Sequence, residues 1–153
     1  MEALGTSSRG VDLLPQRDQF EEDSARVRVA TGVADVTDVA SRIELHGDRY
    51  LRGVFTAHEL RTCDEEPATR ASRLAACFAA KEAVLRVLRP ADLPPPWRSI
   101  EIRRHPDGWT DVHLSGVAAS LAEDAGVVDL AVSITHDQDV AAAVVVALLS
   151  VDD

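Results

Sequence analysis

Basic surface, long apolar runs and cysteine clusters are all scarce in this chain, and each absence excludes a class of protein. The formal net charge is −10 over 153 residues, which argues against nucleic acid as a partner, because non-specific binding needs a basic surface. No run of 18 apolar residues occurs, so the sequence predicts no membrane-spanning helix. The first residues lack the basic and apolar blocks of a signal peptide. We therefore expect a soluble, cytoplasmic protein.

The chain has only two cysteines, Cys63 and Cys77. Their spacing matches no metal site, so we expect reduced, structural thiols. A Gly-rich phosphate loop is also missing. With 46% hydrophobic and 27% charged residues, the chain suits one domain with a real core. We assign residues 26–150 to that domain. Residues 1–25 lack sustained periodicity and are predicted to be a disordered extension.

One long helix organises the prediction. The segment from Pro67 to Arg89 has no internal Pro or Gly and precedes Pro90, which predicts a helix of about six turns. At about 100° per residue, one stripe of this helix faces the core. That stripe comprises Leu74, Phe78, Leu85 and Leu88. Lys81 falls in its middle, where an ammonium needs a partner or ligand, unless it reaches out to solvent along its stem.

Glu82 lies at the edge of this stripe, with Arg86 one turn further on. Such a pair is often an ordinary surface ion pair, worth a few tenths of a kcal/mol. The alternative is that both side chains belong to a functional site.

A strand with alternating valines runs from Arg26 into Asp35. An acid at this place most often caps the following helix, here Val36–Ile43. The alternative is a functional carboxylate at the strand end.

Further elements follow on both sides of the long helix. Two helical pieces, His46–Val54 and Thr56–Cys63, are separated by a capping box in which Thr56 is the N-cap and Glu59 the third helical residue. The last third is rich in strands and is predicted to form two hairpins around a short helix. Their ranges are 97–104 with 109–114, then helix 116–125, then 128–135 with 140–149.

Three polar residues are poorly suited to their apolar settings, namely Asp35, Lys81 and Glu82. Two carboxylates that meet at one point suit Mg²⁺, which completes its shell with waters and substrate phosphates. Lys81 and Arg86 would neutralise phosphate charge. The residues alone therefore indicate Mg²⁺-dependent chemistry on a phosphate ester or anhydride. His136 follows an apolar strand and is either a turn histidine or a ligand.

Several motifs occur in a distinctive order. They are Gly32–Val36, Phe55–Leu60, Phe78–Ala83, Ile100–Ile102 and Ser133–His136, the last followed by Ala141–Val144. In this order they resemble the motifs of the holo-acyl-carrier-protein synthase family, the short 4′-phosphopantetheinyl transferases. The block Phe78–Ala83 is the most specific. The resemblance covers roughly residues 26–149.

The resemblance implies transfer of the phosphopantetheine arm from coenzyme A to a serine of an apo acyl carrier protein in fatty acid or polyketide synthesis. Adenosine 3′,5′-bisphosphate is released. By motif position, Asp35 and Glu82 hold Mg²⁺ and belong to the catalytic group, and Glu82 helps to deprotonate the serine. Lys81 stabilises the leaving phosphate. The implied coenzyme A contacts are Lys81, Arg86, Phe78, Ser133 and His136.

The family likeness also implies an α+β fold, with a long central helix packed on a mainly antiparallel sheet. It implies a homotrimer with active sites between neighbouring subunits. The acidic carrier protein would dock on arginines of the first helix. Arg42 is the first candidate, with Arg49 and Arg52 as further ones; each could instead belong to a solvated helix face.

Four positions depart from the family pattern. Cys77 replaces an arginine, Arg86 replaces a lysine, Arg42 comes one residue late, and Thr110 replaces a proline. They indicate a divergent member that serves a secondary-metabolic carrier protein, such as a polyketide one. The alternative is a weakened member that only binds a carrier protein or a nucleotide. A third alternative, a small unrelated phosphate-ester enzyme, would be favoured if Asp35 and Glu82 lay far apart.

Overall fold

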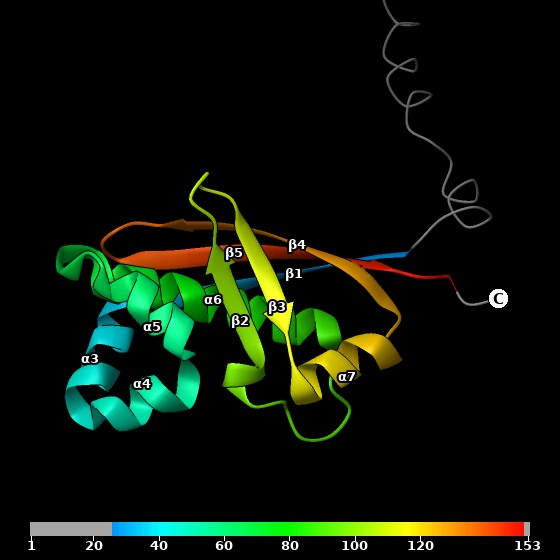
Figure 1. Ribbon diagram of the computed structural model, residues 1–153, viewed down its shortest axis with the longest axis horizontal. Coiled ribbons are helices and arrows are strands. Elements are labelled where there is room, and N and C mark those ends of the chain that lie inside the picture. The colour runs from blue at the N-terminus through cyan, green and yellow to red at the C-terminus, as the bar shows by residue number, and fades with distance from the viewer. Residues whose placement is uncertain (1–25, 152–153) are drawn as a thin grey trace, which may run out of the picture.

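The computed structural model describes residues 26–151 (Figure 1). The elements are β1 (Arg26–Asp35), α3 (Val36–His46), α4 (Asp48–Val54), α5 (Ala57–Asp64), η2 (Pro67–Thr69), α6 (Arg70–Leu88), η3 (Trp97–Ser99), β2 (Ile100–Arg104), β3 (Thr110–Leu114), α7 (Gly116–Asp124), β4 (Val127–His136) and β5 (Val140–Leu149). The predicted extension, 1–25, lies outside the described residues. Within the described part, no helix is long and apolar enough to cross a membrane.

The strands form two antiparallel sheets. One has three strands in the order β1-β5-β4, and the other is the β2–β3 hairpin. Strand β5 is central and pairs with β1 from Arg26↔Leu149 to Asp35↔Val140. The predicted α+β class with antiparallel strands is confirmed. The ends of the elements differ by a few residues, and Trp97–Ser99 is a short 3₁₀ helix in place of the predicted start of a strand.

Helix α6 lies at the centre of the molecule. The three-stranded sheet covers one side of it, while α5 and the β2–β3 hairpin lie on other sides (Figure 1). Buried residues therefore occur all round the helix, many of them alanines. Leu74 and Leu88 are buried as predicted, whereas Phe78 and Leu85 are only half-buried. A single core stripe was too narrow a prediction, because elements pack on several faces.

Gly32 explains how closely β1 approaches α6. A Cβ at this position would lie 1.9 Å from the Ala79 carbonyl oxygen and 3.1 Å from the Ala83 nitrogen. Any side chain would collide with helix backbone that cannot move aside cheaply. The glycine thus permits the contact that brings the end of β1 toward the middle of α6.

The other face of the three-stranded sheet is apolar and uncovered in the single chain. Val27, Val29 and Val33 on β1 are 58%, 61% and 60% exposed. Val146 and Leu148 on β5 are 36% and 38% exposed, and they pair directly with Val29 and Val27. A contiguous apolar face of this kind marks an interaction surface.

Candidate active site

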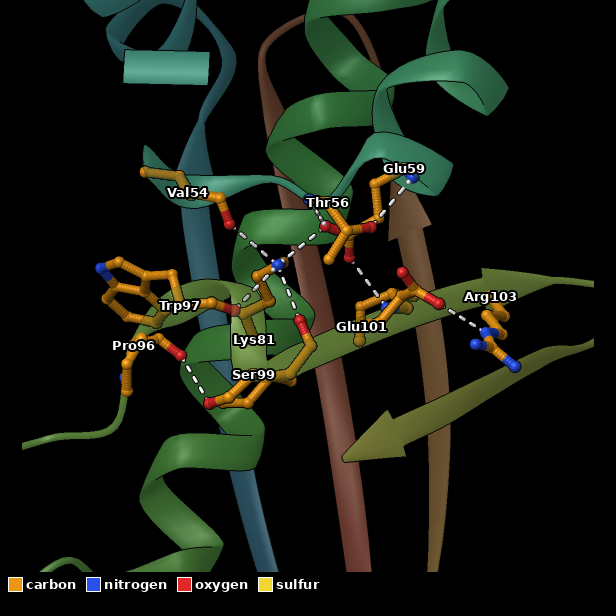
Figure 2. Close-up of polar contacts among 11 residues, drawn as sticks. Val54, Thr56, Glu59, Lys81, Pro96, Trp97, Ser99, Glu101 and Arg103 are labelled. Carbon is orange, nitrogen blue, oxygen red and sulfur yellow. Dashed lines mark hydrogen bonds and ion pairs between the residues drawn. The ribbon is translucent and has the colours of Figure 1, made fainter. Parts of the chain in front are cut away.

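Lys81 is fully buried, with 0% exposure. Figure 2 shows its ammonium between oxygens from several elements. Nζ donates to the backbone carbonyls of Val54 at 2.9 Å, Trp97 at 3.0 Å and Ile100 at 2.7 Å. It also pairs with Oε1 of Glu59 at 2.7 Å. One side chain thus joins α6 to α4, α5, η3 and β2.

Glu59 supplies the compensating charge and is itself 1% exposed. Its Oε1 accepts from the Thr56 backbone N–H at 2.8 Å, while the Thr56 hydroxyl accepts from the Glu59 N–H. The predicted capping box is therefore confirmed. Its Oε2 accepts from the Ile102 N–H at 2.8 Å, which fastens α5 to β2. Both carboxylate oxygens are fully used inside the protein.

Burial lowers the pKa of Lys81 from its ordinary value, and the adjacent Glu59 carboxylate opposes that shift. The prediction that Lys81 stabilises the leaving phosphate stays a prediction. The side chain does lie on a core stripe and does need a partner, but the partner is Glu59 together with three carbonyls. Sequence reasoning gave Glu59 only its capping role and missed this pair. The capping box could have indicated this pair, because it places the Glu59 carboxylate on a helix next to the one that contains Lys81.

Glu82, the next residue, lies at the surface. Its side chain is 25% exposed and pairs with Arg86 at 2.8 Å. Arg86 is 57% exposed and also donates to the Thr31 carbonyl at 2.8 Å, four residues before Asp35. The i,i+4 pair is therefore also a bridge from α6 to β1. Glu82 lies in the region where these two elements are in contact.

Asp35 ends β1 and caps α3. The predicted helix cap is therefore confirmed. Its Oδ1 accepts from the Thr37 N–H at 2.8 Å and the Asp38 N–H at 3.2 Å. A capping carboxylate keeps a second oxygen, and Asp35 is exposed. Capping and ligand binding therefore do not exclude each other.

Asp35 and Glu82 are the oxygen ligands that Mg²⁺ prefers. Within residues 26–151, no three His, Cys, Asp or Glu side chains gather closely enough to hold an ion. The described part of one chain therefore suits at most a two-carboxylate site, in which waters and substrate phosphates would supply the other ligands.

His136 lies in a different region from Glu82. It lines a cavity of about 140 Å³ together with Arg73, Arg104 and Cys77. Arg73 and Glu82 are separated by about two and a half turns, so they project from opposite sides of α6. One subunit thus divides the predicted site residues between two sides of its central helix.

Ser133 is separated from His136 as well. Along β4, Val132 and Ile134 are half-buried and Ser133 is exposed, so Ser133 points to the uncovered face of the sheet. Side chains three residues apart on a strand point to opposite faces. The structure does not bring these two predicted contacts together. Phe78 packs against Trp97, with ring centroids 5.1 Å apart.

Comparison with known proteins decides the family. A family model described as the 4′-phosphopantetheinyl transferase superfamily matches residues 30–145. A holo-[acyl-carrier-protein] synthase of Gloeobacter violaceus is 34% identical over 77% of this chain and 89% of its own length. A second, from Rhodopirellula baltica, is 37% identical over 66% of this chain and 80% of its own length. The chain belongs to the holo-acyl-carrier-protein synthase family.

A solved structure agrees with this assignment. The ACPS–CoA complex of Chronobacterium ammoniagenes superposes with a TM-score of 0.71 and is 28% identical, covering 82% of this chain and 99% of that one. The likeness confirms the predicted transferase fold. As a member of this family, the chain is a 4′-phosphopantetheinyl transferase.

The predicted docking arginines are all exposed, but only Arg42 belongs to the first helix, α3. Arg49 and Arg52 lie on α4. Arg52 borders a hollow with two further arginines, Arg61 and Arg98, that sequence reasoning missed because they come from α5 and η3. Phe55, Ala57 and Leu60 also line this hollow. A surface that combines arginines with apolar side chains suits an acidic partner.

Three of the family departures can be placed in the structure. Arg86 uses the fork of its guanidinium to reach Glu82 and Thr31 at once, which a lysine amine is less suited to do. Cys77 lines the cavity together with Arg73 and Cys63. Thr110 begins β3 opposite Arg104, and nothing in the structure explains the threonine.

Proposed function

We propose that this transferase is a holo-[acyl-carrier-protein] synthase that moves the 4′-phosphopantetheine arm from coenzyme A to a serine of an apo acyl carrier protein. The serine oxygen forms a bond to the β-phosphorus of coenzyme A, and the bond to adenosine 3′,5′-bisphosphate breaks. The observation that carries the proposal is Glu82, a partly exposed carboxylate on the central helix, paired with Arg86, which also binds the Thr31 carbonyl of β1. We place the reaction in the cytoplasm, where coenzyme A is available.

The roles of the side chains follow from their positions. Asp35 and Glu82 would hold Mg²⁺, which supplies charge neutralisation at the diphosphate. Glu82 accepts the serine proton, directly or through a water. Arg86 is exposed enough to turn part of its guanidinium to a phosphate. Lys81 takes no part in the transfer, because its ammonium is already enclosed by four oxygens.

The acceptor is proposed to be acidic, since the hollow at Arg52 presents three arginines around apolar side chains. Arg42 on α3 and Arg49 on α4 are exposed and are further candidates for this docking surface. An overall charge of −10 makes such a local patch necessary for an acidic partner. The departures at Cys77 and Arg86 favour a polyketide-type carrier protein as the acceptor.

The active form is proposed to be a homotrimer with sites between subunits. Two observations support self-association: the uncovered valine face of β1 and β5, and the separation of His136 from Glu82 on opposite sides of α6. A neighbouring copy could place its own cavity against Glu82 and complete the coenzyme A site. Val146→Glu should therefore yield smaller species in light scattering after size exclusion, and activity should fall with them.

The direct test is to incubate the protein with coenzyme A, Mg²⁺ and an apo carrier protein. Mass spectrometry should show the carrier protein gaining about 340 Da, the mass of the arm. Glu82→Ala should abolish the product. Glu123→Ala is the matched control, because Glu123 is an exposed acid on α7. Unchanged turnover of Glu82→Ala would refute the site.

The alternative, a weakened member that only binds, makes a different prediction. It would retain affinity for coenzyme A and carrier protein in titration calorimetry while the mass of the carrier protein stayed unchanged. Both acidic residues of the proposed metal site are present, which favours the catalytic reading.

A further inference from the structure

The two cysteines of the chain line the same cavity from two neighbouring helices. Cys63 lies on α5 and Cys77 on α6, and these two helices pack against each other. Both are free thiols. Cys63 is buried, with 3% exposure, whereas Cys77 is half-buried. Neither thiol has a role in the proposed transfer, so the presence of both at one cavity requires a separate explanation.

A cavity borders both cysteines. The cavity that contains His136 is lined by Cys63 and Cys77 together, and its volume is about 140 Å³. A water occupies about 30 Å³ in the liquid, so a molecule as small as hydrogen peroxide fits within this space.

We infer that Cys63 and Cys77 are a reversible oxidation site, at which a peroxide converts the two thiols into an intramolecular disulfide that joins α5 to α6. This inference rests on the shared cavity and on the packing of the two helices, and its test is read out by mass without the transferase activity. The bridge would form beside Glu59, which lies one turn before Cys63 and holds Lys81. Oxidation would therefore tie two helices that the buried ion pair already joins.

The chemistry proceeds in two balanced steps. The Cys63 thiolate attacks one oxygen of the peroxide, the O–O bond breaks, and a sulfenic acid and hydroxide result. The Cys77 sulfur then attacks the Cys63 sulfur, the S–S bond forms, and water leaves with the thiol proton. Two thiols lose two electrons in total, and the peroxide gains them.

The order of the two steps follows from the influence of each thiol on the other. The neighbouring Cys77 lowers the pKa of the Cys63 thiol. Cys63, together with burial, raises the pKa of the Cys77 thiol. Cys63 is therefore the attacking thiolate and Cys77 the resolving thiol.

The test treats the full chain with a small excess of hydrogen peroxide, then denatures it in an alkylating agent. The intact mass should fall by about 2 Da, the two hydrogens lost, with no alkyl group added. A peptide map should join the segments that contain Cys63 and Cys77. A thiol reductant should restore two alkylatable cysteines.

Two variants and one control sharpen the result. Cys77→Ser should stop at the Cys63 sulfenic acid, a gain of about 16 Da, whereas Cys63→Ser should react far more slowly. The chain unfolded in guanidinium should form the bridge at least about tenfold more slowly, because the fold holds the thiols together. Three results would overturn the inference: two thiols that remain alkylatable, a bridge between two chains, or added oxygen without a bridge. The peptide map of the unmodified chain shows whether Cys63 and Cys77 are joined, even if a variant fails to fold.

Discussion

Lys81 and Glu82 are neighbours in sequence, yet their surroundings are opposite. The Lys81 ammonium has no exposure and is held by four oxygens. The Glu82 carboxylate is 25% exposed, and its partner Arg86 is 57% exposed. Consecutive helix residues differ by about 100° in direction, so one turns into the core while the other reaches the surface. The first ion pair therefore serves the fold, and the second is available for chemistry.

The contrast teaches how a charge in a core stripe should be interpreted. A buried charge requires a partner, but the requirement does not say whether protein or ligand provides it. Here the protein provides it through Glu59, whose carboxylate serves the capping box, Lys81 and β2 simultaneously. A surface acid carries no such requirement, and this leaves Glu82 free to act.

The largest effect is expected from Lys81→Met. This change leaves the Glu59 charge buried and removes the donor to three carbonyls, and breaking a buried pair costs about 3–5 kcal/mol. Urea unfolding followed by circular dichroism should show the free energy of unfolding reduced by this amount. A loss below about 1 kcal/mol would mean that the pair contributes no more than an exposed one.

Adding Glu59→Gln to Lys81→Met should recover part of that loss. The double variant no longer buries an unpaired charge, although the Val54, Trp97 and Ile100 carbonyls still lack their donor. Its unfolding midpoint should lie between those of Lys81→Met and the unmodified chain. A double variant less stable than the single one would contradict charge burial as the cause.

Gly32→Ala should have an intermediate effect, about 1–3 kcal/mol. The added methyl would meet the Ala79 carbonyl and push β1 away from α6. The same shift would move Thr31 from Arg86, so the transfer rate should fall together with stability. Gly53→Ala is the control, because a Cβ there meets nothing within 4 Å. Equal stability of the two variants would contradict the close approach.

The smallest effect on stability is expected from Arg86→Ala. An exposed i,i+4 pair contributes well under about 1 kcal/mol, so thermal unfolding should change little. The rate of arm transfer should nevertheless fall, because the guanidinium near Glu82 is lost. A variant that unfolds several degrees earlier with normal turnover would reverse the roles assigned to the two pairs.

Much of the fold could be predicted from local signals. The Thr56 and Glu59 capping box, Asp35 as a cap and the long helix before Pro90 each depend on nearby residues, and the structure has them within a few positions. The motif order predicted the family. Contacts between distant segments could not be predicted in this way, as the Glu59–Lys81 pair and the arginines around Phe55 show. No local pattern encodes which helix will face which strand.

The rate of arm transfer by Lys81→Met, compared with Glu82→Gln, is the most direct test of the division between the two neighbours. Both would be assayed with saturating coenzyme A and apo carrier protein, at a temperature where circular dichroism shows each variant folded, and expressed per folded chain. We predict that Lys81→Met retains activity within about tenfold, while Glu82→Gln loses about 10²–10⁴-fold. A folded Lys81→Met protein as inactive as Glu82→Gln would contradict the account, because Lys81 would then take part in the transfer.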